Sequence, residues 1–419
     1  MAEPLIYITR KQALLFACFL LGYEFLTYIA NDMIMPGMIN VVRSFNGPES
    51  AVASSLTAYI VGGASLQLLL GPLSDRFGRR PVMIFGACLF FVCTVFIACS
   101  NSVNQFLMAR FFQGMGLCFI GVVGYATLQE IFNEIDAVRL IAMMANVSIL
   151  APLLGPLMGA VFIHYFSWRL IFVVISFFSL IALWGLWRYM PESVGQKKKD
   201  GGEIERISLT LKVIFDNYKH LMFNRSFLLG SIALGLIGMP CMAWIALAPV
   251  ILISDAKLTL IQYGIWQIPV FSAAIIGNWV LLRLTRTKSI KKILLLGSMV
   301  TVISLLICVI LPLIINDHFQ WLMPGFIFYF FGLALTGGPL TRITLFSTPI
   351  AKGTSSALMN MVALGIQALG IEVANAIYHH NNYYFGFYAA LSGVFYLIIV
   401  VLAFFVNNSQ YMDDNSRTV

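Results

Sequence analysis

The sequence contains twelve apolar stretches, each long enough to cross a lipid bilayer as a helix. About 20 apolar residues span the hydrocarbon core in this form. Because no water is available there, each backbone N–H and C=O must bond within its own segment, which favours helices. We therefore predict an all-α integral membrane protein with twelve transmembrane helices at residues 13–35, 52–72, 81–100, 104–127, 139–162, 168–189, 226–253, 261–284, 292–314, 320–341, 353–378 and 383–406.

The charged residues are too few for a soluble protein and are unevenly placed. Only 11% of the residues are charged, whereas a soluble domain carries roughly 25%. With the N-terminus in the cytoplasm, the cytoplasmic segments hold all the Lys and Arg except Arg43, Arg110, Arg169 and Lys257. This asymmetry follows the positive-inside rule and predicts both termini in the cytoplasm. It accounts for the net charge of +8 without a nucleic-acid partner, so the expected partner is the lipid bilayer.

One long polar segment, residues 191–225, divides the twelve spans into two groups of six. Lys197–Lys199 and Gly201–Gly202 indicate a flexible cytoplasmic linker, in which 208–221 has the pattern of an amphipathic surface helix. We expect an N-terminal half at 1–190 and a C-terminal half at 226–419. Transporters are commonly built from such repeats, with the substrate site near the midplane between them.

Several other kinds of site are not indicated by the sequence. The seven cysteines lie in apolar segments without paired spacing, so we expect neither a disulfide nor a metal site. His379 and His380 are adjacent in an expected outer loop, where a solvated turn is the simpler interpretation. The first apolar run is too long for a cleavable signal peptide. No H-E-x-x-H, G-x-S-x-G or phosphate-binding loop occurs, so we expect no enzyme, no ATP and no cofactor.

Two acids in the first span carry the strongest functional signal. Glu24 and Asp32 lie eight residues apart, roughly 12 Å along a helix and about 80° around it. Each costs about 2.5–3.5 kcal/mol at the bilayer centre. Tyr28 lies four residues from both, and Asn31 precedes Asp32. We expect this polar ladder to line a water-filled cleft, with packing alone as the alternative.

Arg110 is the only Lys or Arg inside a span core. A cation there requires a cavity or a partner. We expect Asp32, Glu24 or backbone carbonyls as its partners, and favour a place near Asp32. Burial raises the pKa of a carboxyl group and a nearby cation lowers it, so the two effects together can let an acid bind and release a proton. Glu372, a third acid within a span, either takes part in coupling or reaches toward the outer face.

Three motifs resemble those of the major facilitator superfamily. "GPLSDRFGRRP" between spans 2 and 3 fits G-x-x-x-D-R-x-G-R-R/K, "RFFQG" in span 4 fits R-x-x-Q-G, and "GPLMGA" in span 5 resembles the motif of drug/proton antiporters. The residues concerned in the loop motif are Gly71, Asp75, Arg76, Gly78, Arg79 and Arg80, and those in the antiporter motif are Gly155, Pro156 and Gly159. From the residue types we expect Gly71 to permit close helix packing, Gly78 a tight turn, and the span-5 motif a kink with tight packing.

Similar stretches along nearly the whole chain resemble MdfA-type multidrug/proton antiporters, among them "YEFLTYIANDMIMPGM" and "RITLFSTPIAKGT". The resemblance implies the major facilitator fold, an inner bacterial membrane and a role in antibiotic resistance. It assigns proton and drug coupling to Glu24 and Asp32, and it matches Arg110 to the arginine of span 4. It also implies a conformational latch, in which Glu130 at the cytoplasmic end of span 4 pairs with the basic cluster of the loop; a solvated loop acid is the alternative.

Further side chains are candidates for the drug cavity. Methionine and aromatic side chains can repack around varied apolar ligands, although most of them in this chain are expected to face lipid or core. Polar groups on the Arg110 helix, Gln113 and Tyr125, are the better candidates. The full set of expected substrate-binding residues is Tyr28, Asn31, Gln113, Phe119, Tyr125, Met144, Met239, Trp244 and Asn278.

The sequence thus predicts a monomeric proton-coupled multidrug efflux antiporter. It would export lipophilic cationic, neutral or zwitterionic drugs in exchange for protons by alternating access. Embedded acids serve uptake equally well, so proton-coupled import of a small nutrient is the alternative. An intramembrane enzyme and a channel are further classes, but the first lacks its motifs and the second needs no protonatable pair.

Overall fold

The computed structural model describes residues 4–132, 134–197, 199, 211–350 and 352–404, and the described residues are almost entirely helical. They form two compact units. The first comprises Met1–Ile214 and Leu258–Gln267, and the second Phe215–Lys257 and Ile268–Val419. These units assign residues 191–214 and the start of the eighth span to the first unit. This division differs from the halves and the linker expected from the sequence, and those expected boundaries stay a prediction.

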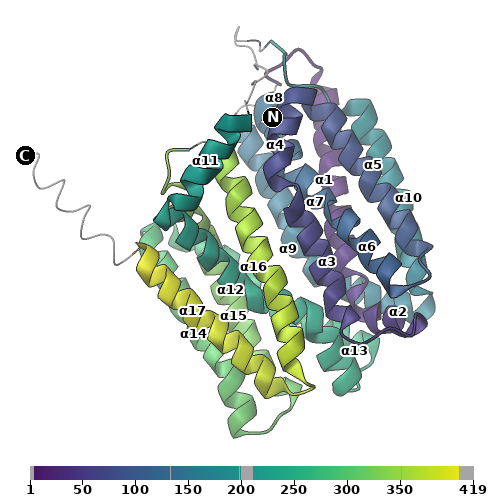
Figure 1. The fold of residues 1–419 in the computed structure, drawn as a ribbon, viewed down its shortest axis with the longest axis vertical. Helices are drawn as coiled ribbons and strands as arrows, with labels where there is room; N and C mark the ends of the chain where they lie inside the picture. The colour runs from purple at the N-terminus through teal and green to yellow at the C-terminus, as the bar shows by residue number, and fades with distance from the viewer. Residues whose placement is uncertain (1–3, 133, 198, 200–210, 351, 405–419) are drawn as a thin grey trace, which may run out of the picture. The chain divides into compact units, whose positions relative to one another are not determined.

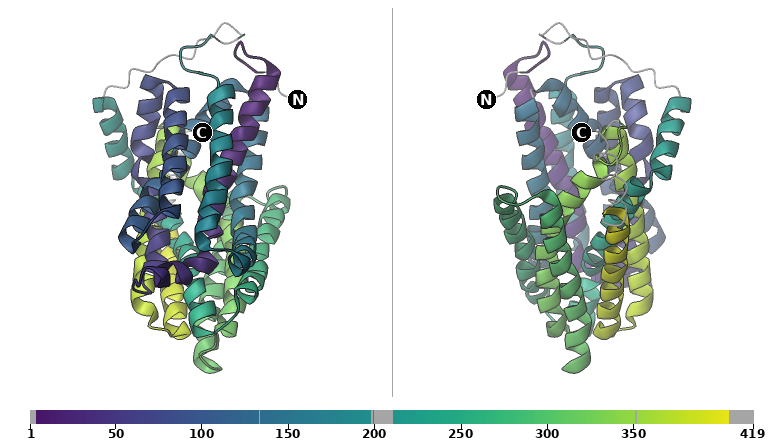
Figure 2. Two further views of the ribbon diagram at one scale, coloured as in Figure 1. Left: turned by 90° about the vertical axis from the view of Figure 1, so that its right-hand side faces the viewer. Right: turned by 90° about the vertical axis from the view of Figure 1, so that its left-hand side faces the viewer.

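The first unit holds the helices of the first six spans, and the axes of its long helices lie roughly parallel or antiparallel to one another (Figures 1 and 2). α1 packs against α9 and α10, α5 against α6 and α10, and α3 against α6. The elements are α1 (Arg10–Asp32), η1 (Met35–Gly37), α2 (Met38–Ser44), α3 (Ala51–Ser65), α4 (Gln67–Phe77), α5 (Arg79–Ala98), α6 (Val103–Gly114), α7 (Gly116–Cys118), η2 (Phe119–Gly124), α8 (Tyr125–Ile131), α9 (Glu134–Tyr165) and α10 (Trp168–Tyr189).

The second unit holds the remaining spans around an apolar core that includes Ile237, Leu294 and Leu340. Here α12 packs against α16 and α17, and α14 packs against α15 and α17. The elements are α12 (Arg225–Pro249), η3 (Val250–Asp255), α13 (Leu260–Leu284), α14 (Ile290–Ile314), η4 (Phe319–Trp321), α15 (Leu322–Leu345), α16 (Lys352–Tyr378) and α17 (Asn382–Phe404). The start of α13 belongs to the first unit. α11 (Leu211–Phe223) overlaps the predicted amphipathic helix, whose residues 208–210 lie outside the described chain.

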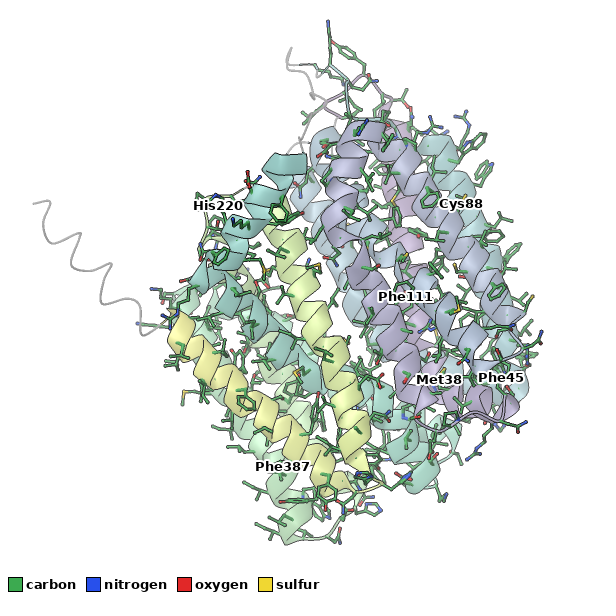
Figure 3. All side chains as sticks on the ribbon, viewed as in Figure 1. Met38, Phe45, Cys88, Phe111, His220 and Phe387 are labelled. Atoms are coloured by element: carbon green, nitrogen blue, oxygen red, sulfur yellow. The ribbon has the colours of Figure 1, made fainter. Side chains whose placement is uncertain are left out.

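The described helices account for all twelve predicted spans. Ten are long and apolar enough to cross a membrane, and α3 with α4, bent by 43°, make an eleventh. The remaining span, the fifth along the chain, is α9, which contains the apolar stretch Leu150–Tyr165. Large apolar side chains such as Phe387, which is 48% exposed, project from the outer surface (Figure 3). Extensive apolar exposure of this kind is expected where the solvent is lipid.

Capping side chains mark the starts of two helices, and a π-helical segment interrupts the fourth span. The Thr9 side chain accepts a hydrogen bond from the backbone N–H of Gln12 at the start of α1, and Asn224 does the same for Phe227 in α12. Such caps satisfy donors that have no partner within the helix. Between α7 and α8 the chain forms a π-helical segment, η2, directly before Tyr125. Wide turns of this type are frequent at functional sites.

Candidate functional site

Glu24 lies within α1 and is almost completely buried, with 2% of its surface exposed. The hydroxyl of Tyr125, at the start of α8, donates a hydrogen bond of 2.7 Å to its Oε1. Its other oxygen, Oε2, is buried without a partner among the described residues. Oε1 is thus held in place, while Oε2 can accept a proton or a hydrogen bond from a ligand.

Asp32 is the last residue of α1 and has a similar environment. It is 4% exposed, and the side-chain amide of Asn31 donates a hydrogen bond of 3.1 Å to its Oδ1. Oδ2 is buried without a partner in the described part of the chain. Both acids therefore have one hydrogen-bonded oxygen and one unpartnered oxygen. An unpartnered charged oxygen is costly inside a membrane protein, so both sites favour binding of a proton or a cation.

Arg110 is fully buried on α6 and is bonded to α1 and to its own helix. One terminal nitrogen donates to Oδ1 of Asn31, and the other donates to Oε1 of Gln113 at 2.8 Å and to the carbonyl of Ala30 at 3.4 Å. The guanidinium lies over the ring of Tyr59, with 4.5 Å between its carbon and the ring centroid. A cation above an aromatic face is attracted by the ring quadrupole.

Of the expected partners of Arg110, which were Asp32, Glu24 or backbone carbonyls, the structure shows the backbone carbonyl of Ala30. No ion pair within 4.0 Å joins it to Asp32 or Glu24, all three of which are described residues. The connection to Asp32 runs through Asn31, whose amide accepts from Arg110 with its oxygen and donates to Asp32 with its nitrogen. Arg110 is therefore close to Asp32 but donates no hydrogen bond to it, and Oδ2 of Asp32 keeps no partner among the described residues.

Sequence reasoning missed two polar residues that complete this network. Thr94 on α5 accepts a hydrogen bond of 2.9 Å from the side-chain amide of Gln113, so Gln113 is held on both sides. Tyr59 on α3 donates from its hydroxyl to the carbonyl of Thr27 at 2.7 Å and presents its ring to Arg110. Both are polar residues within apolar spans, which is the signal that could have identified them.

The antiporter motif packs directly against the end of α1. A Cβ atom added to Gly155 would lie 2.6 Å from Cβ of Asp32, and one added to Gly159 would lie 1.9 Å from the carbonyl oxygen of Met33. Neither distance is possible without movement of α1 or α9. The close packing expected of Gly155 and Gly159 is therefore present. Pro156 lies between them inside α9.

The other candidate lining residues are divided between the units. In the first unit, Tyr28 is partly buried on α1, and Met144 on α9 is 2% exposed. Phe119 packs against α5, because a Cβ on Gly86 would lie 2.2 Å from its ring, and its place in the lining stays a prediction. The second unit contains buried Trp244, which stacks on Phe326, and the partly buried Met239 and Asn278.

The loop motif forms an ion-pair cluster centred on Arg79. Its guanidinium pairs with Glu130 at 2.8 Å and with Asp75 at 2.7 Å, and it also donates to the Ser74 hydroxyl. Glu130 in turn accepts a hydrogen bond of 2.5 Å from the hydroxyl of Ser193. Among the described contacts, therefore, Arg79 alone of the three expected arginines pairs with Glu130.

The remaining motif residues have different contacts. Arg76 lies beside the ring of Phe77, and Arg80 donates to the carbonyl of Trp187 at 2.7 Å. Gly78 has φ of +101°, which L side chains rarely adopt, so the expected tight turn is present. The expectation for Gly71 was wrong. A Cβ there would only reach Val122 at 3.9 Å, an ordinary contact, so close packing does not require glycine at this position.

Glu192, which sequence reasoning also missed, joins α5 to the segment after α10. Its carboxylate accepts hydrogen bonds from the backbone N–H groups of Arg79, Arg80, Ser193 and Val194 at 2.9–3.2 Å. A carboxylate at a helix N-terminus satisfies unpaired donors and interacts favourably with the helix dipole. The acid in "PES" at the start of the linker was visible, but its distant partners were not.

We expect Glu192→Ala to lower the free energy of unfolding by about 1–2 kcal/mol, because the start of α5 loses its cap. The thermal midpoint of the purified protein in detergent, followed by tryptophan fluorescence, measures the change. Asp216→Ala on the exposed surface of α11 is the control for loss of an acid. An unchanged midpoint for Glu192→Ala would show that the cap contributes nothing.

Two features lie outside this site. In the second unit, Asp255 accepts a hydrogen bond of 2.6 Å from the Tyr378 hydroxyl and lies 2.8 Å from Nδ1 of His380. His379 and His380 are exposed and form a turn, as expected. Among the described residues no group of His, Cys, Asp or Glu has the arrangement of a metal site. Glu372 is partly buried on α16, and both expectations for it stay open.

A family model described as the Major Facilitator Superfamily matches residues 20–371 of the chain. The chain belongs to the major facilitator superfamily. The prediction of its twelve-helix fold is thereby confirmed, as is the prediction that it is a transporter and not an enzyme. Three features of the structure correspond to the three sequence motifs of this superfamily. They are the Arg79 ion-pair cluster, the buried Arg110 and the close packing at Gly155 and Gly159.

Curated relatives match most of this major facilitator chain. A protein from Yersinia pestis bv. Antiqua (strain Angola) named "Multidrug transporter MdfA" is 46% identical over 88% of both chains. A protein of the same name from Escherichia coli O6:H1 is 42% identical over 87% of both chains. These similarities confirm the predicted MdfA-type subfamily.

Solved structures resemble the fold at low sequence identity. The xylose transporter XylE from E. coli has a TM-score of 0.70 and 16% identity, covering 94% of this chain and 98% of its own. The human organic anion transporter MFSD10 has a TM-score of 0.65 and 15% identity, covering 94% of this chain and 100% of its own. At these identities the likeness supports the fold alone.

Proposed function

We propose that this protein is a multidrug efflux transporter that exchanges drugs for protons. The observation that carries the proposal is the state of Glu24 and Asp32. Both are buried in the first span, each has one unpartnered oxygen, and neither is paired with the buried Arg110. The relatives named as multidrug transporters support the class of substrate.

Exchange follows if a proton and a drug compete for the same carboxylates. A lipophilic cation arriving from the cytoplasm displaces a proton, and a proton from the opposite side then displaces the drug. Alternating access keeps the two events on opposite sides of the membrane. When a neutral drug is exchanged for one proton, one net charge crosses the membrane, and moving it through 100 mV is worth about 2.3 kcal/mol, which sustains a concentration ratio of about fifty.

The proposal includes the arrangement in the cell. The protein is a monomer in the inner bacterial membrane, with both termini in the cytoplasm, as the distribution of basic residues indicates. Its substrates are lipophilic cationic, neutral or zwitterionic compounds, and protons are the coupling ion. The cluster of Arg79, Asp75 and Glu130 acts as a cytoplasmic latch that must open during the cycle.

Proton release on drug binding tests the proposal. Tetraphenylphosphonium added to the purified protein in weakly buffered detergent is expected to acidify the medium, because it displaces protons from the two acids. The Glu24→Gln/Asp32→Asn double variant is the control and should release none. Uptake together with a proton, the alternative, predicts no acidification. An unchanged pH with the wild-type protein would therefore overturn antiport.

A further inference from the structure

Pro240 interrupts the hydrogen-bond ladder of α12 at the middle of the seventh span, Arg225–Asp255. Proline has no backbone N–H, and its ring clashes with the carbonyl four residues earlier in the helix, here that of Leu236. Little water is available inside a bilayer to satisfy the backbone groups that such a break releases, so neighbouring helices commonly do so. α12 packs against α15 and α16, and all three helices are labelled in Figure 1. Contacts with these two helices therefore decide the shape of α12 at this point.

The hydroxyl of Tyr329 on α15 bonds to two backbone groups of α12 on either side of this proline. It donates to the carbonyl of Ile237 at 2.5 Å and accepts from the N–H of Cys241 at 3.1 Å. These two residues are four apart, so a regular α-helix would join the same two groups directly. Insertion of a side chain into the ladder in this way is a known cause of helix kinks. The Tyr329 hydroxyl therefore bridges one step of the α12 ladder.

Aromatic contacts fix Tyr329 against α12. Its side chain is completely buried, and its ring meets that of Phe330 edge-on, with 5.4 Å between the centroids. Phe326, three residues before Tyr329 on α15, stacks on Trp244 of α12 at 4.7 Å. Trp244 lies three residues beyond Cys241. α15 thus holds α12 twice, through the Tyr329 hydroxyl at the break and through an aromatic stack beyond it.

α16 confines the part of α12 that precedes the break. A Cβ atom added to Gly235 of α12 would lie 2.7 Å from Cβ of Ile366. One added to Gly370 of α16 would lie 2.7 Å from Cγ of Met239, the residue directly before Pro240. Neither distance is possible without movement of a neighbour, so the two helices are in close contact here. A change at the break is therefore expected to move mainly the part of α12 that follows it.

Two side chains that are expected to contact drugs lie on opposite sides of the break, Met239 before the proline and Trp244 after it. Their relative placement depends on how far the ladder is opened between them. We propose that Tyr329 is a positioning residue for drug binding, whose hydroxyl holds α12 open at the break and so places Trp244 relative to Met239. The role of these two side chains as drug contacts rests on the proposed function, whereas the bridge through the hydroxyl does not.

Equilibrium binding of tetraphenylphosphonium to the purified full chain in detergent tests the proposal. In Tyr329→Phe the ring keeps its packing, and the N–H of Cys241 can bond directly to the carbonyl of Ile237, so the variant should fold. We expect roughly fivefold weaker affinity, because contacts that are no longer pre-organised cost binding free energy. The numbers of drug molecules bound and protons released per protein should equal those of wild type, since Glu24 and Asp32 are unchanged. A merely destabilised protein would instead lose binding sites at unaltered affinity.

Tyr396→Phe is the matched control, because it removes another buried tyrosine hydroxyl of the same unit, which hydrogen-bonds to the Ser298 hydroxyl at 2.6 Å. It should bind tetraphenylphosphonium as wild type does. If the wild type binds and Tyr329→Phe binds equally well, or if Tyr396→Phe loses as much affinity, this proposal is overturned while the proposed function stands. A wild-type protein that binds no tetraphenylphosphonium would overturn both.

Pro240→Ala shows whether Tyr329 acts through the break in α12. Alanine supplies the N–H that can bond to the carbonyl of Leu236 and removes the ring clash, so the ladder can close without the tyrosine. The hydroxyl then has no break to hold, and Pro240→Ala/Tyr329→Phe should bind tetraphenylphosphonium as well as Pro240→Ala alone. A further loss of roughly fivefold in the double variant would mean that the two residues act independently, and it would overturn the proposal.

Discussion

Asp32→Asn is expected to abolish proton-driven transport while the protein still folds and inserts into the membrane. Asparagine has nearly the same shape as aspartate and keeps the oxygen that accepts from Asn31. The tight contact with Gly155 is also preserved. The variant cannot bind and release a proton, however, so proton flow can no longer expel a drug. Drug accumulation in inverted membrane vesicles with an imposed pH gradient measures the effect.

The control for Asp32→Asn is the same substitution at Asp216, an exposed acid on α11. Asp216→Asn should transport as well as wild type, and both variants should be present in the membrane in equal amounts. If Asp32→Asn still builds a substrate gradient, Asp32 is not a coupling group and the proton must bind elsewhere.

Arg110→Ala is expected to give the second largest effect, a loss of most drug-induced proton release and at least a tenfold fall in transport. The substitution removes the buried cation beside Asp32 and leaves acceptors on Asn31, Gln113 and Ala30 without a donor. Each buried group left without its partner costs about 1–3 kcal/mol. The pH change on addition of tetraphenylphosphonium to the purified variant measures proton release.

Arg110→Lys separates charge from geometry. Lysine keeps a positive charge but lacks the planar fork that reaches Asn31 and Gln113 at once. We expect partial proton release from this variant and less transport than wild type. Proton release equal to wild type in Arg110→Ala would refute the role of Arg110 in coupling, whatever its effect on stability.

The fold followed from the sequence because the bilayer restricts the possible structures severely. Each apolar stretch must satisfy its own backbone hydrogen bonds, so span positions and helical character could be predicted together. The buried acids were equally visible, since Glu24 and Asp32 stand out in an apolar segment. The glycines at 155 and 159 were correctly read as packing positions, although Gly71 was not.

The partners of these residues depended on contacts between distant segments. Arg110 meets Asn31 across 79 residues, and Glu192 meets the backbone of Arg79 across 113. The sequence shows that a buried arginine needs hydrogen-bond acceptors. It does not show which of several possible acceptors the arginine meets. A place near Asp32 was predicted for Arg110, but nothing in the residue spacing shows that Asn31 stands between the two side chains.

The sequence by itself determined the membrane class, the twelve helices, the family and the identity of the buried acids. Hydrophobicity, charge placement and motif spacing are local properties and can be read along the chain. Only the tertiary structure decided that Asn31 stands between Arg110 and Asp32, that each acid keeps one unpartnered oxygen, and that Glu192 caps α5. These facts depend on which helix faces meet, because a hydrogen bond forms only when packing brings its two atoms within about 3 Å.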